Sequence, residues 1–371
     1  MSGHALLSPS SSSRWINCPP SAKLNADDDT GSSYAQQGTD AHSLCEYKVL
    51  KALGHDVSDP TEKLEYFDEE MSECTDAYCE YVMEQVQASK ESCLDPIVLV
   101  EQRLDFSRWV PESFGTADCV IVADDVMTVI DFKYGLGVLV EADNNSQMKM
   151  YALGALNLCE SLYEIKKIRM VIFQPRRDNI STAEISTEEL LGWADDTLIP
   201  AAYLAAKGAG EYMAGKHCQF CSVKAACRKR AEYNLKLAQY DFAVPDTLSD
   251  DEISMILERA DTFIGWVNDV KDYALEKAIG GKSYSGFKLV EGRSNRRYIN
   301  DDAVVSVVTD AGYDPFEKKL MGVTAMTKML GAKQFNTLLG SLIEKPKGKP
   351  TLVSESDKRP TWTIDDFKEE K

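Results

Sequence analysis

The chain has 371 residues, of which 44% are hydrophobic, and its formal net charge at pH 7 is −19. Such a length suits one elaborated domain with a smaller second domain. No apolar run approaches the roughly 18 residues that span a bilayer, and no signal-peptide pattern is present, so we expect a soluble cytoplasmic protein with no membrane partner. The acidic balance argues against a general nucleic-acid coat protein, because DNA phosphates repel an acidic surface.

The start of the chain offers one feature of interest, a cysteine in front of two prolines. Residues 2–13 are polar and serine-rich and show no pattern of a buried core. Cys18 then precedes the two prolines, and because proline disfavours regular structure we expect an exposed loop there. Residues 25–33 have the composition of a further loop.

Two helices are predicted next, over residues 33–53 and 68–90. In the first helix, His42 and Glu46 lie on one face because they are four residues apart. A single helical histidine can be a metal ligand or an ordinary hydrogen-bonding partner. The spacing leaves both roles open.

A strand is predicted over residues 97–104, and it carries a charged residue, Glu101, within an apolar run. A charge in such a place is costly unless it is paired. Glu101 could face a metal site or form an ion pair with an arginine, and the sequence does not choose between these roles.

Two short apolar runs, residues 119–123 and 127–132, predict a β-hairpin with an acidic turn between them. Asp118 stands at the start of the first strand and Asp131 near the end of the second, so antiparallel pairing makes them neighbours. Lys133 points to the same side as Asp131, because side chains alternate along a strand. Two carboxylates beside an ammonium suit Mg²⁺ or Mn²⁺ in metal-assisted phosphodiester hydrolysis. Taken alone, the pattern also fits solvated acids at strand ends.

The segment after the hairpin adds polar residues near the same place. Residues 134–145 predict a glycine-containing loop that could admit a DNA strand beside the metal. A helix over residues 146–159 then presents Gln147 and Tyr151 on one face. These two side chains would lie close to the paired acids.

A further strand is predicted over residues 165–174, and Arg176 and Arg177 follow its end. Two arginines at this edge are candidate contacts to DNA phosphates. A helix over residues 187–207 comes next. This order of helices and strands predicts an α/β fold with a central mixed sheet flanked by helices.

Ten cysteines occur in the chain, and without an export signal they do not suggest a disulfide framework. Cys218, Cys221 and Cys227 have the spacing Cys-x2-Cys-x5-Cys, one ligand short of a four-thiolate site. Cys18 is the best candidate for the fourth ligand, and such a site would clip the N-terminal loop to the end of the domain. The spacing fits either Zn²⁺ or a [4Fe–4S] cluster. Arg228 follows directly and is another candidate DNA contact.

We therefore expect a first domain over residues 1–235 and a mainly helical second domain over residues 236–371. Helices in the second domain are predicted over residues 248–279, 300–311 and 324–344. A basic strand or hairpin is predicted at residues 287–299, and a Pro- and Lys-rich, extended tail from residue 345.

Together these motifs resemble the PD-(D/E)xK nuclease superfamily in its RecB/AddB-like branch. They are similar in particular to iron–sulfur exonucleases that carry one cysteine before the nuclease core and three after it. The matching stretches are residues 38–42, 115–118, 131–133, 147–151 and the four cysteines. The opening LSPSSSSRWINCPPSAKL also resembles a phage and prophage family of uncharacterised nuclease-like proteins. One departure is that the aspartate after proline in the superfamily here follows Ala117.

The resemblance implies a restriction-endonuclease-like fold and a role for each matching residue. The implied ligands of Mg²⁺ or Mn²⁺ are His42, Asp118, Asp131 and the carbonyl of Phe132. The implied catalytic residues are Asp118, Asp131, Lys133, Gln147 and Tyr151. The implied [4Fe–4S] ligands are Cys18, Cys218, Cys221 and Cys227, with Zn²⁺ as the alternative occupant.

The implied function is a metal-dependent DNA exonuclease that acts on linear duplex ends during phage recombination, in the cytoplasm of a bacterial host. A single-strand annealing protein and a second copy of the chain are further partners that the resemblance leaves open. A rival interpretation is a non-catalytic DNA-binding or scaffold protein with a structural four-cysteine zinc site.

Overall fold

The structure is a computed structural model, and it describes residues 5–26, 33–236, 248–290, 299–310, 316 and 321–343. Its contacts divide the chain into two units, residues 1–276 and 277–371. This division falls later in the chain than the expected boundary after residue 235. The first unit holds the sheet and every residue of the two sites described below.

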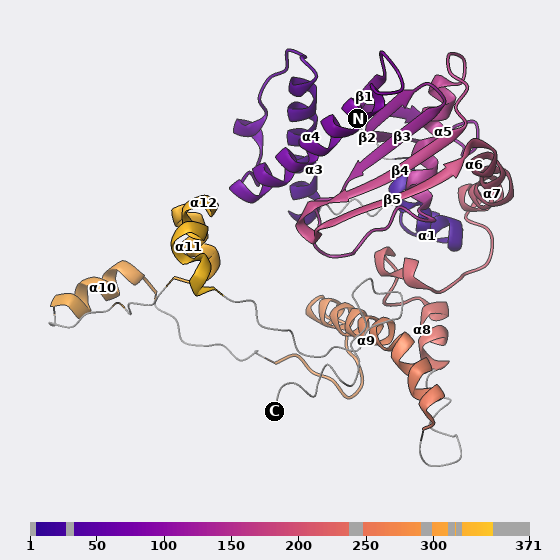
Figure 1. Ribbon diagram of the computed structural model, residues 1–371. Coiled ribbons are helices and arrows are strands. Elements are labelled where there is room, and N and C mark those ends of the chain that lie inside the picture. Colours follow the sequence, from indigo (N-terminus) through magenta and orange to yellow (C-terminus); the bar gives the residue numbers. More distant parts are fainter. Residues whose placement is uncertain are drawn as a thin grey trace. The chain divides into compact units, whose positions relative to one another are not determined.

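A five-stranded mixed sheet forms the centre of the first unit, with its strands in the order β1-β2-β3-β4-β5 (Figure 1). The strands span Ile97–Asp105, Phe114–Ala123, Val126–Phe132, Lys167–Gln174 and Asn179–Ser186. Neighbouring strands are antiparallel except β3 and β4, which are parallel. The central strands consist largely of Val, Ile and Met because both faces of the sheet are covered.

Helices cover both faces of this sheet (Figure 1). α3 (Ser33–Ala52) and α4 (Glu69–Ser89) pack on one face and share a core with Ile121, Ile130 and Phe132. The helices whose buried residues share the core of the other face are α1 (Ser12–Asn17), α5 (Ser146–Cys159), α6 (Thr187–Trp193) and α7 (Ile199–Lys207). The predicted α/β class, a mixed sheet flanked by helices, is confirmed.

Most elements agree with the predicted ones within a few residues, but two differ in ways that matter. β2 begins at Phe114, so Asp118 lies in the middle of a strand and not at its start. The helix expected over residues 187–207 is divided by a π-helical turn, Ala194–Leu198, between α6 and α7. Pro200 follows this turn, and its missing backbone N–H cannot complete a regular helical ladder.

β5 was not predicted at all, because the inward side of its first half is polar, although Ala183 and Ile185 in its second half pack against the core. Asn179 and Ser181 face the interior, while Ile180 is 53% exposed. The inward polar groups bind the backbone of the preceding loop: Asn179 donates to Val140 O (2.8 Å), and Ser181 Oγ accepts from Ala142 N (2.9 Å). A polar inward face gives no hydrophobic alternation from which to predict a strand.

The N-terminal segment also differs from its prediction. Leu7 and Trp15 are buried, so this serine-rich stretch does contribute to the core. Cys18 is buried as well, between α1 and α2 (Ser21–Leu24), and the expected exposed loop is wrong. The two prolines separate two short helices without preventing them, since a proline just before a first helical turn lacks only an N–H that the helix would not use.

Downstream of the sheet, the described chain is helical. The helices are α8 (Arg228–Leu235), α9 (Asp250–Ile279), α10 (Asp301–Asp310), α11 (Val323–Leu330) and α12 (Ala332–Leu339). The single helix expected over residues 324–344 is two helices, because Gly331 adopts a φ of +73° between them.

Two other expectations for the C-terminal part fall mostly on residues that the structure does not describe. The expected basic strand is not a strand at residues 287–290, and residues 291–298 lie outside the described ones, as does the tail from residue 345. Within the described ranges, none of the helices combines the length and hydropathy that crossing a membrane would take.

Candidate functional site

Three acidic residues form a row across the first three strands. The register of β1, β2 and β3 brings Glu101, Asp118 and Asp131 to one level of the sheet. Glu101 has a φ of +47°, in the left-handed region, and its backbone pairing with β2 is interrupted there. A left-handed glutamate inside a strand is strained, and such strain is typical of functional sites.

His42 on α3 joins two of these acids. Its Nδ1 lies 3.1 Å from Asp118 Oδ1 and 3.8 Å from Glu101 Oε1. One ligand atom from each of His42, Glu101 and Asp118 lies within 4.8 Å of the other two. One imidazole and two carboxylates are suitable ligands for Mn²⁺ or Mg²⁺. Glu101, whose role the sequence left open, therefore faces the candidate metal centre.

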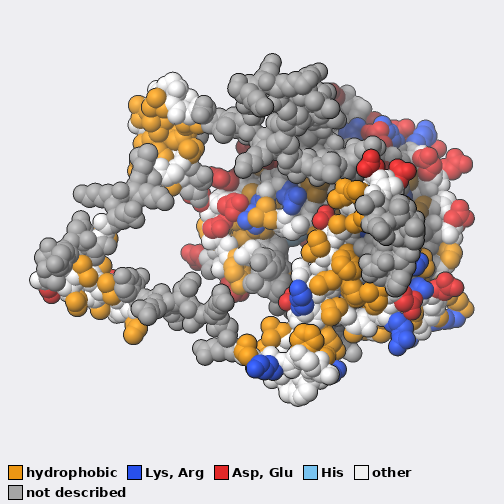
Figure 2. Space-filling view, turned by 90° about the horizontal axis from the view of Figure 1, so that it is seen from below, with side chains coloured by type: hydrophobic (Ala, Val, Ile, Leu, Met, Phe, Trp, Pro, Cys, Tyr) orange, Lys and Arg blue, Asp and Glu red, His pale blue; other side chains and the backbone are white. Residues whose placement is uncertain are grey.

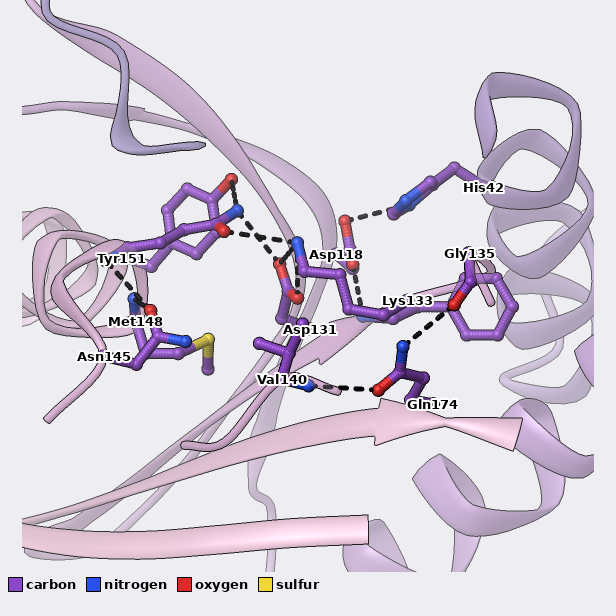
Figure 3. A network of polar contacts seen from close by, with 12 residues as sticks. His42, Asp118, Asp131, Lys133, Gly135, Val140, Asn145, Met148, Tyr151 and Gln174 are labelled. Carbon is purple, nitrogen blue, oxygen red and sulfur yellow. Dashed lines mark hydrogen bonds and ion pairs between the residues drawn. The ribbon is translucent and has the colours of Figure 1, made fainter. Parts of the chain in front are cut away.

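The third acid, Asp131, is not part of this group of three and binds a different set of side chains (Figure 3). Lys133 Nζ lies 2.9 Å from Asp131 Oδ2 and donates to Gln147 Oε1 at 3.2 Å. Gln147 Nε2 in turn donates to Asp131 Oδ1 (3.3 Å) and to Tyr151 OH (3.0 Å). The four predicted residues Asp131, Lys133, Gln147 and Tyr151 thus form one polar network.

Backbone hydrogen bonds fix both parts of the site, which are the His42–Glu101–Asp118 group and the network around Asp131. Phe132, between Asp131 and Lys133, donates its backbone N–H to Asp118 Oδ2 at 2.6 Å. Its carbonyl as a metal ligand stays a prediction. At the start of α5, the Asn145 side chain caps the helix by accepting from the backbone N–H of Gln147, which sets the direction of that residue.

Neighbouring charges stabilise His42, Lys133 and Asp118 in their charged forms, whereas burial raises the pKa of Glu101 and of Asp131. Burial opposes the charged form of His42, but Asp118 and Glu101 outweigh it and raise the pKa of the imidazole to about 10. Burial likewise opposes the charge on Lys133, and Asp131 nevertheless raises the pKa of that ammonium. The pKa of Asp118 is lowered, because His42 and the N–H of Phe132 outweigh its burial. At neutral pH the site therefore holds anions and cations side by side.

Both halves of the site line one cavity of about 460 Å³. Its walls comprise the predicted residues His42, Asp118, Asp131, Lys133, Gln147 and Tyr151 together with Ala5, Ser8, Pro9, Ser10, Glu101, Arg103, Phe114, Gly115 and Thr116. The N-terminal stretch was missed because a serine-rich run carries no periodic signal. Arg103 was missed too, because the left-handed Glu101 interrupts the alternation of β1, so the sequence did not show which side Arg103 faces.

The four predicted cysteines lie around a second, smaller cavity. It is lined by Cys18, Cys218, Cys221 and Cys227, and also by His217. The amide of Asn25 donates to Cys221 Sγ at 3.5 Å, and Gly215 N donates to Cys218 Sγ at 3.4 Å. N–H donors directed at sulfur favour thiolates that hold a metal.

Hydrogen bonds also join the two chain segments that supply these cysteines. Ser222 donates its backbone N–H to Asn25 Oδ1 at 2.7 Å and its hydroxyl to Leu24 O at 3.0 Å. His217, which lines the cavity, is bound through its Nε2 to Met213 O at 2.9 Å. The segments around Cys18 and Cys218 therefore meet as the expected clip requires.

The three arginines predicted to contact DNA are placed differently from one another. Arg176 forms a two-pronged ion pair with Glu70 (3.2 and 3.1 Å) and lies over the ring of Tyr134. Arg177 donates to Leu136 O at 2.5 Å. Arg228 is exposed at the start of α8. Neither Arg176 nor Arg177 lines the acidic cavity, so a role in binding DNA stays a prediction for all three.

The one face drawn in Figure 2 shows no large basic patch among its described residues. On the face seen in Figure 2, the Lys and Arg side chains of the described residues stand in small separate groups among Asp and Glu.

A mixed α/β sandwich with a His–Glu–Asp group at one cavity and four cysteines at another defines the architecture. The family model described as "Protein of unknown function (DUF2800)" matches residues 4–360, and the chain belongs to that family. A solved structure titled "Crystal structure of SSO0001" is 14% identical with a TM-score of 0.22, and the match covers 51% of this chain and 96% of that one. A TM-score this low carries no argument about fold or function.

Proposed function

We propose that the protein is a metal-dependent deoxyribonuclease with a PD-(D/E)xK-type site that degrades linear DNA from its ends. The observation that supports this proposal best is that His42, Glu101 and Asp118 line the same cavity as Asp131 and Lys133. The first three residues would hold Mg²⁺ or Mn²⁺. Such an ion, when bound, makes water more acidic and polarises a phosphate oxygen.

The remaining residues of the network position the reacting groups. The ammonium of Lys133, between Asp131 and Gln147, orients the attacking water and offsets the charge that develops on the phosphate. Asp131 holds that ammonium in place, and Tyr151 fixes the amide of Gln147. Because each partner is already hydrogen-bonded, little reorganisation is needed when the substrate arrives.

We further propose that Cys18, Cys218, Cys221 and Cys227 hold a [4Fe–4S] cluster with a structural role. The cluster is preferred to zinc because the Cys-x2-Cys-x5-Cys spacing with one earlier cysteine resembles that of the iron–sulfur exonucleases. A single zinc ion held by the same four thiolates is the alternative.

The setting we propose is phage or prophage recombination, on the basis of the sequence resemblance. Resection of a duplex end would leave a single strand for an annealing protein. A second copy of the chain could supply processivity, since a ring or pair of subunits can stay on its substrate between cuts.

The test compares end-labelled linear DNA with covalently closed circular DNA in Mn²⁺. The wild-type chain should degrade the linear form and spare the circle, and Asp131→Asn should reduce the rate at least about 100-fold. Asp125→Asn is the matched control, because Asp125 is an exposed residue of the turn in the same hairpin and does not line the cavity. Unchanged degradation by Asp131→Asn would refute the assigned chemistry. A wild-type chain that binds DNA and zinc but cuts neither substrate would establish the non-catalytic alternative.

A further inference from the structure

Arg103 is a cation at the acidic cavity that the proposed chemistry has not used. It lies on β1 two residues after Glu101 and lines the same cavity as Asp118, Asp131 and Lys133. Its guanidinium carbon is 4.0 Å from the centre of the Phe114 ring, which also lines the cavity. Stacking on an aromatic face holds a guanidinium in one plane and leaves its N–H groups directed outward at the edge.

The partners of Arg103 differ from those of the other arginines near the sheet edge. Within the described part of the chain, its guanidinium forms no ion pair with a carboxylate. Arg176 is already bound by Glu70, and Arg177 by the carbonyl of Leu136. Arg103 can therefore accept a new anion without giving up an existing ion pair.

The charge of the cavity creates a need for such a cation. Three carboxylates, Glu101, Asp118 and Asp131, line it, and Lys133 is already bound to Asp131. With one divalent ion bound and His42 neutral as its ligand, the charges of the three carboxylates, Lys133 and the ion cancel, so a further cation is needed to attract a DNA phosphate that enters. Hydroxyls of Ser8 and Ser10 line the same cavity and add neutral hydrogen-bonding groups.

We propose that Arg103, stacked on Phe114, is the binding site for a backbone phosphate of the DNA strand next to the phosphate that is cut. This inference rests on the proposed nuclease function and adds to it the residue that holds the substrate. A guanidinium binds a phosphate through two parallel N–H···O bonds, which gives both affinity and orientation. The phosphates contacted by Arg103 carry no base identity, so binding is independent of sequence.

The experiment measures binding of a fluorescent single-stranded oligonucleotide by anisotropy, with Ca²⁺ in place of Mn²⁺ to prevent cleavage. Two probes are used, one with normal phosphodiesters and one with uncharged methylphosphonate linkages. Arg103→Gln should weaken binding of the normal probe roughly tenfold. It should also reduce the slope of log affinity against log salt by about one. The same substitution should leave binding of the uncharged probe unchanged.

Arg108→Gln is the matched control. Arg108 also lies over an aromatic ring, that of Trp109, at 5.0 Å, and it is exposed, but it pairs with Glu160 and does not line the cavity. Its substitution should leave both affinities at the wild-type value. Arg103→Lys should give an intermediate affinity, because lysine keeps the charge and loses the two-pronged geometry. Isothermal titration with Mn²⁺ should give the same affinity for Arg103→Gln as for the wild type, which shows that the metal centre is intact.

The outcomes separate this inference from the proposed function. If the wild-type chain degrades DNA and Arg103→Gln binds the normal probe as tightly as Arg108→Gln, the phosphate site is wrong and the nuclease stands. An equal loss for both probes would also overturn it, since Arg103 would then act through the fold. The wild-type chain could instead cut no DNA but bind the charged probe more tightly than the uncharged one, with this preference lost in Arg103→Gln. That result would refute the proposed nuclease function and support the phosphate-binding role of Arg103.

Discussion

Glu101 shows how much of the candidate metal centre depends on one backbone conformation. Its φ of +47° interrupts the pairing of β1 with β2 at the level of Asp118 and brings its carboxylate to within 3.8 Å of His42. A left-handed glutamate costs on the order of 1 kcal/mol, which the rest of the sheet must offset. Such a cost is understandable if the carboxylate has a ligand to bind.

We predict that Glu101→Gln weakens Mn²⁺ binding by at least about tenfold, because an amide oxygen lacks the charge that attracts a divalent cation. Isothermal titration calorimetry measures this affinity directly. Asp105→Asn is the control, since Asp105 is an exposed acid on the same strand and does not line the cavity. Equal affinities for Glu101→Gln and the control would remove Glu101 from the ligand set.

At the scale of single residues, the sequence predicted pairs whose spacing along a strand or helix places both side chains on one side. Asp131 and Lys133 are two apart on a strand, and Gln147 and Tyr151 are four apart on a helix, so each pair had to share a side. Glu101 stayed open because alternation along a strand does not apply at a left-handed residue. Arg103 was missed because a single exposed arginine on a strand forms no pattern until the cavity is known.

At the scale of elements, a side chain at the end of β4 fixes the loop between Lys133 and Gln147. Gln174, which is 1% exposed, donates to Gly135 O (2.9 Å) and Val138 O (2.8 Å) and accepts from Val140 N (3.2 Å), as Figure 3 shows in part. The loop runs from Lys133 to the cap of α5, so its conformation sets the distance between Lys133 and Gln147.

We predict that Gln174→Ala lowers the free energy of unfolding by about 2 kcal/mol, because buried backbone groups of the loop lose their partners. The DNA cleavage rate should fall as well, while Mn²⁺ affinity should stay at the wild-type value, since His42, Glu101 and Asp118 come from α3, β1 and β2 and not from the loop. Urea denaturation and titration calorimetry measure the two effects. Loss of Mn²⁺ affinity equal to the loss of cleavage would contradict this positioning role.

A second pair of elements, α8 and α9, is joined by ion pairs. Asp269 on α9 binds the buried Arg230 on α8 at 2.6 Å and Lys224 near the cysteines at 2.9 Å. Its burial would raise the pKa of its carboxyl, but hydrogen bonds from Arg230 and Lys224 outweigh burial and lower it below the ordinary value of 3.8. A lowered carboxyl pKa contributes stability that is present above the unfolded-state value and is lost as the pH falls through the folded-state value.

Asp269→Asn should therefore lower the melting temperature at pH 7, where the wild-type carboxylate is charged and the variant leaves Arg230 buried without its anion. The difference between variant and wild type should shrink as the pH is lowered below about 4, because the carboxylate becomes protonated. Differential scanning calorimetry across this pH range checks the trend. Asp261→Asn, a substitution on α9 outside this ion pair, is the control, and a difference that does not depend on pH would argue against the ion pair as the cause.

Elements with a strong hydrophobic period were predicted closely, and α5 was predicted to the residue. β5 was not, because its first two inward side chains, Asn179 and Ser181, bind the loop after β3 and are polar for that reason. The two-helix arrangement of α11 and α12 depended on Gly331, whose positive φ a run of helix-forming residues does not reveal.

At the scale of the whole first unit, one short segment connects the two candidate centres. Ala5, Ser8, Pro9 and Ser10 line the acidic cavity, and Cys18 lines the cysteine cavity. Between them Trp15 is fully buried and donates to Ser8 O at 3.1 Å, and Ser113 donates to Leu7 O at 2.7 Å. The wall of the acidic cavity and Cys18, the proposed ligand at the cysteine cavity, are therefore parts of one anchored stretch.

We predict that the wild-type chain contains about four iron atoms and acid-labile sulfide, and that Cys18→Ala loses both. Because Cys18 anchors this stretch, the variant should also have a lower melting temperature and a lower cleavage rate. Cys159→Ala is the control, since Cys159 is buried in the sheet core and lines neither cavity. Full iron content in Cys18→Ala would exclude it as a ligand.

The shared stretch has a practical consequence for anyone who handles the protein. Atmospheric oxygen attacks thiolate-bound iron long before it modifies a histidine or a carboxylate. If the proposed cluster is present, a sample kept in air would lose its colour first, and the wall formed by Ala5, Ser8, Pro9 and Ser10 would then lose its anchor although every acid beside it was chemically intact. Comparing anaerobically and aerobically purified protein would show whether an inactive sample lacks the proposed chemistry or has only lost the proposed iron.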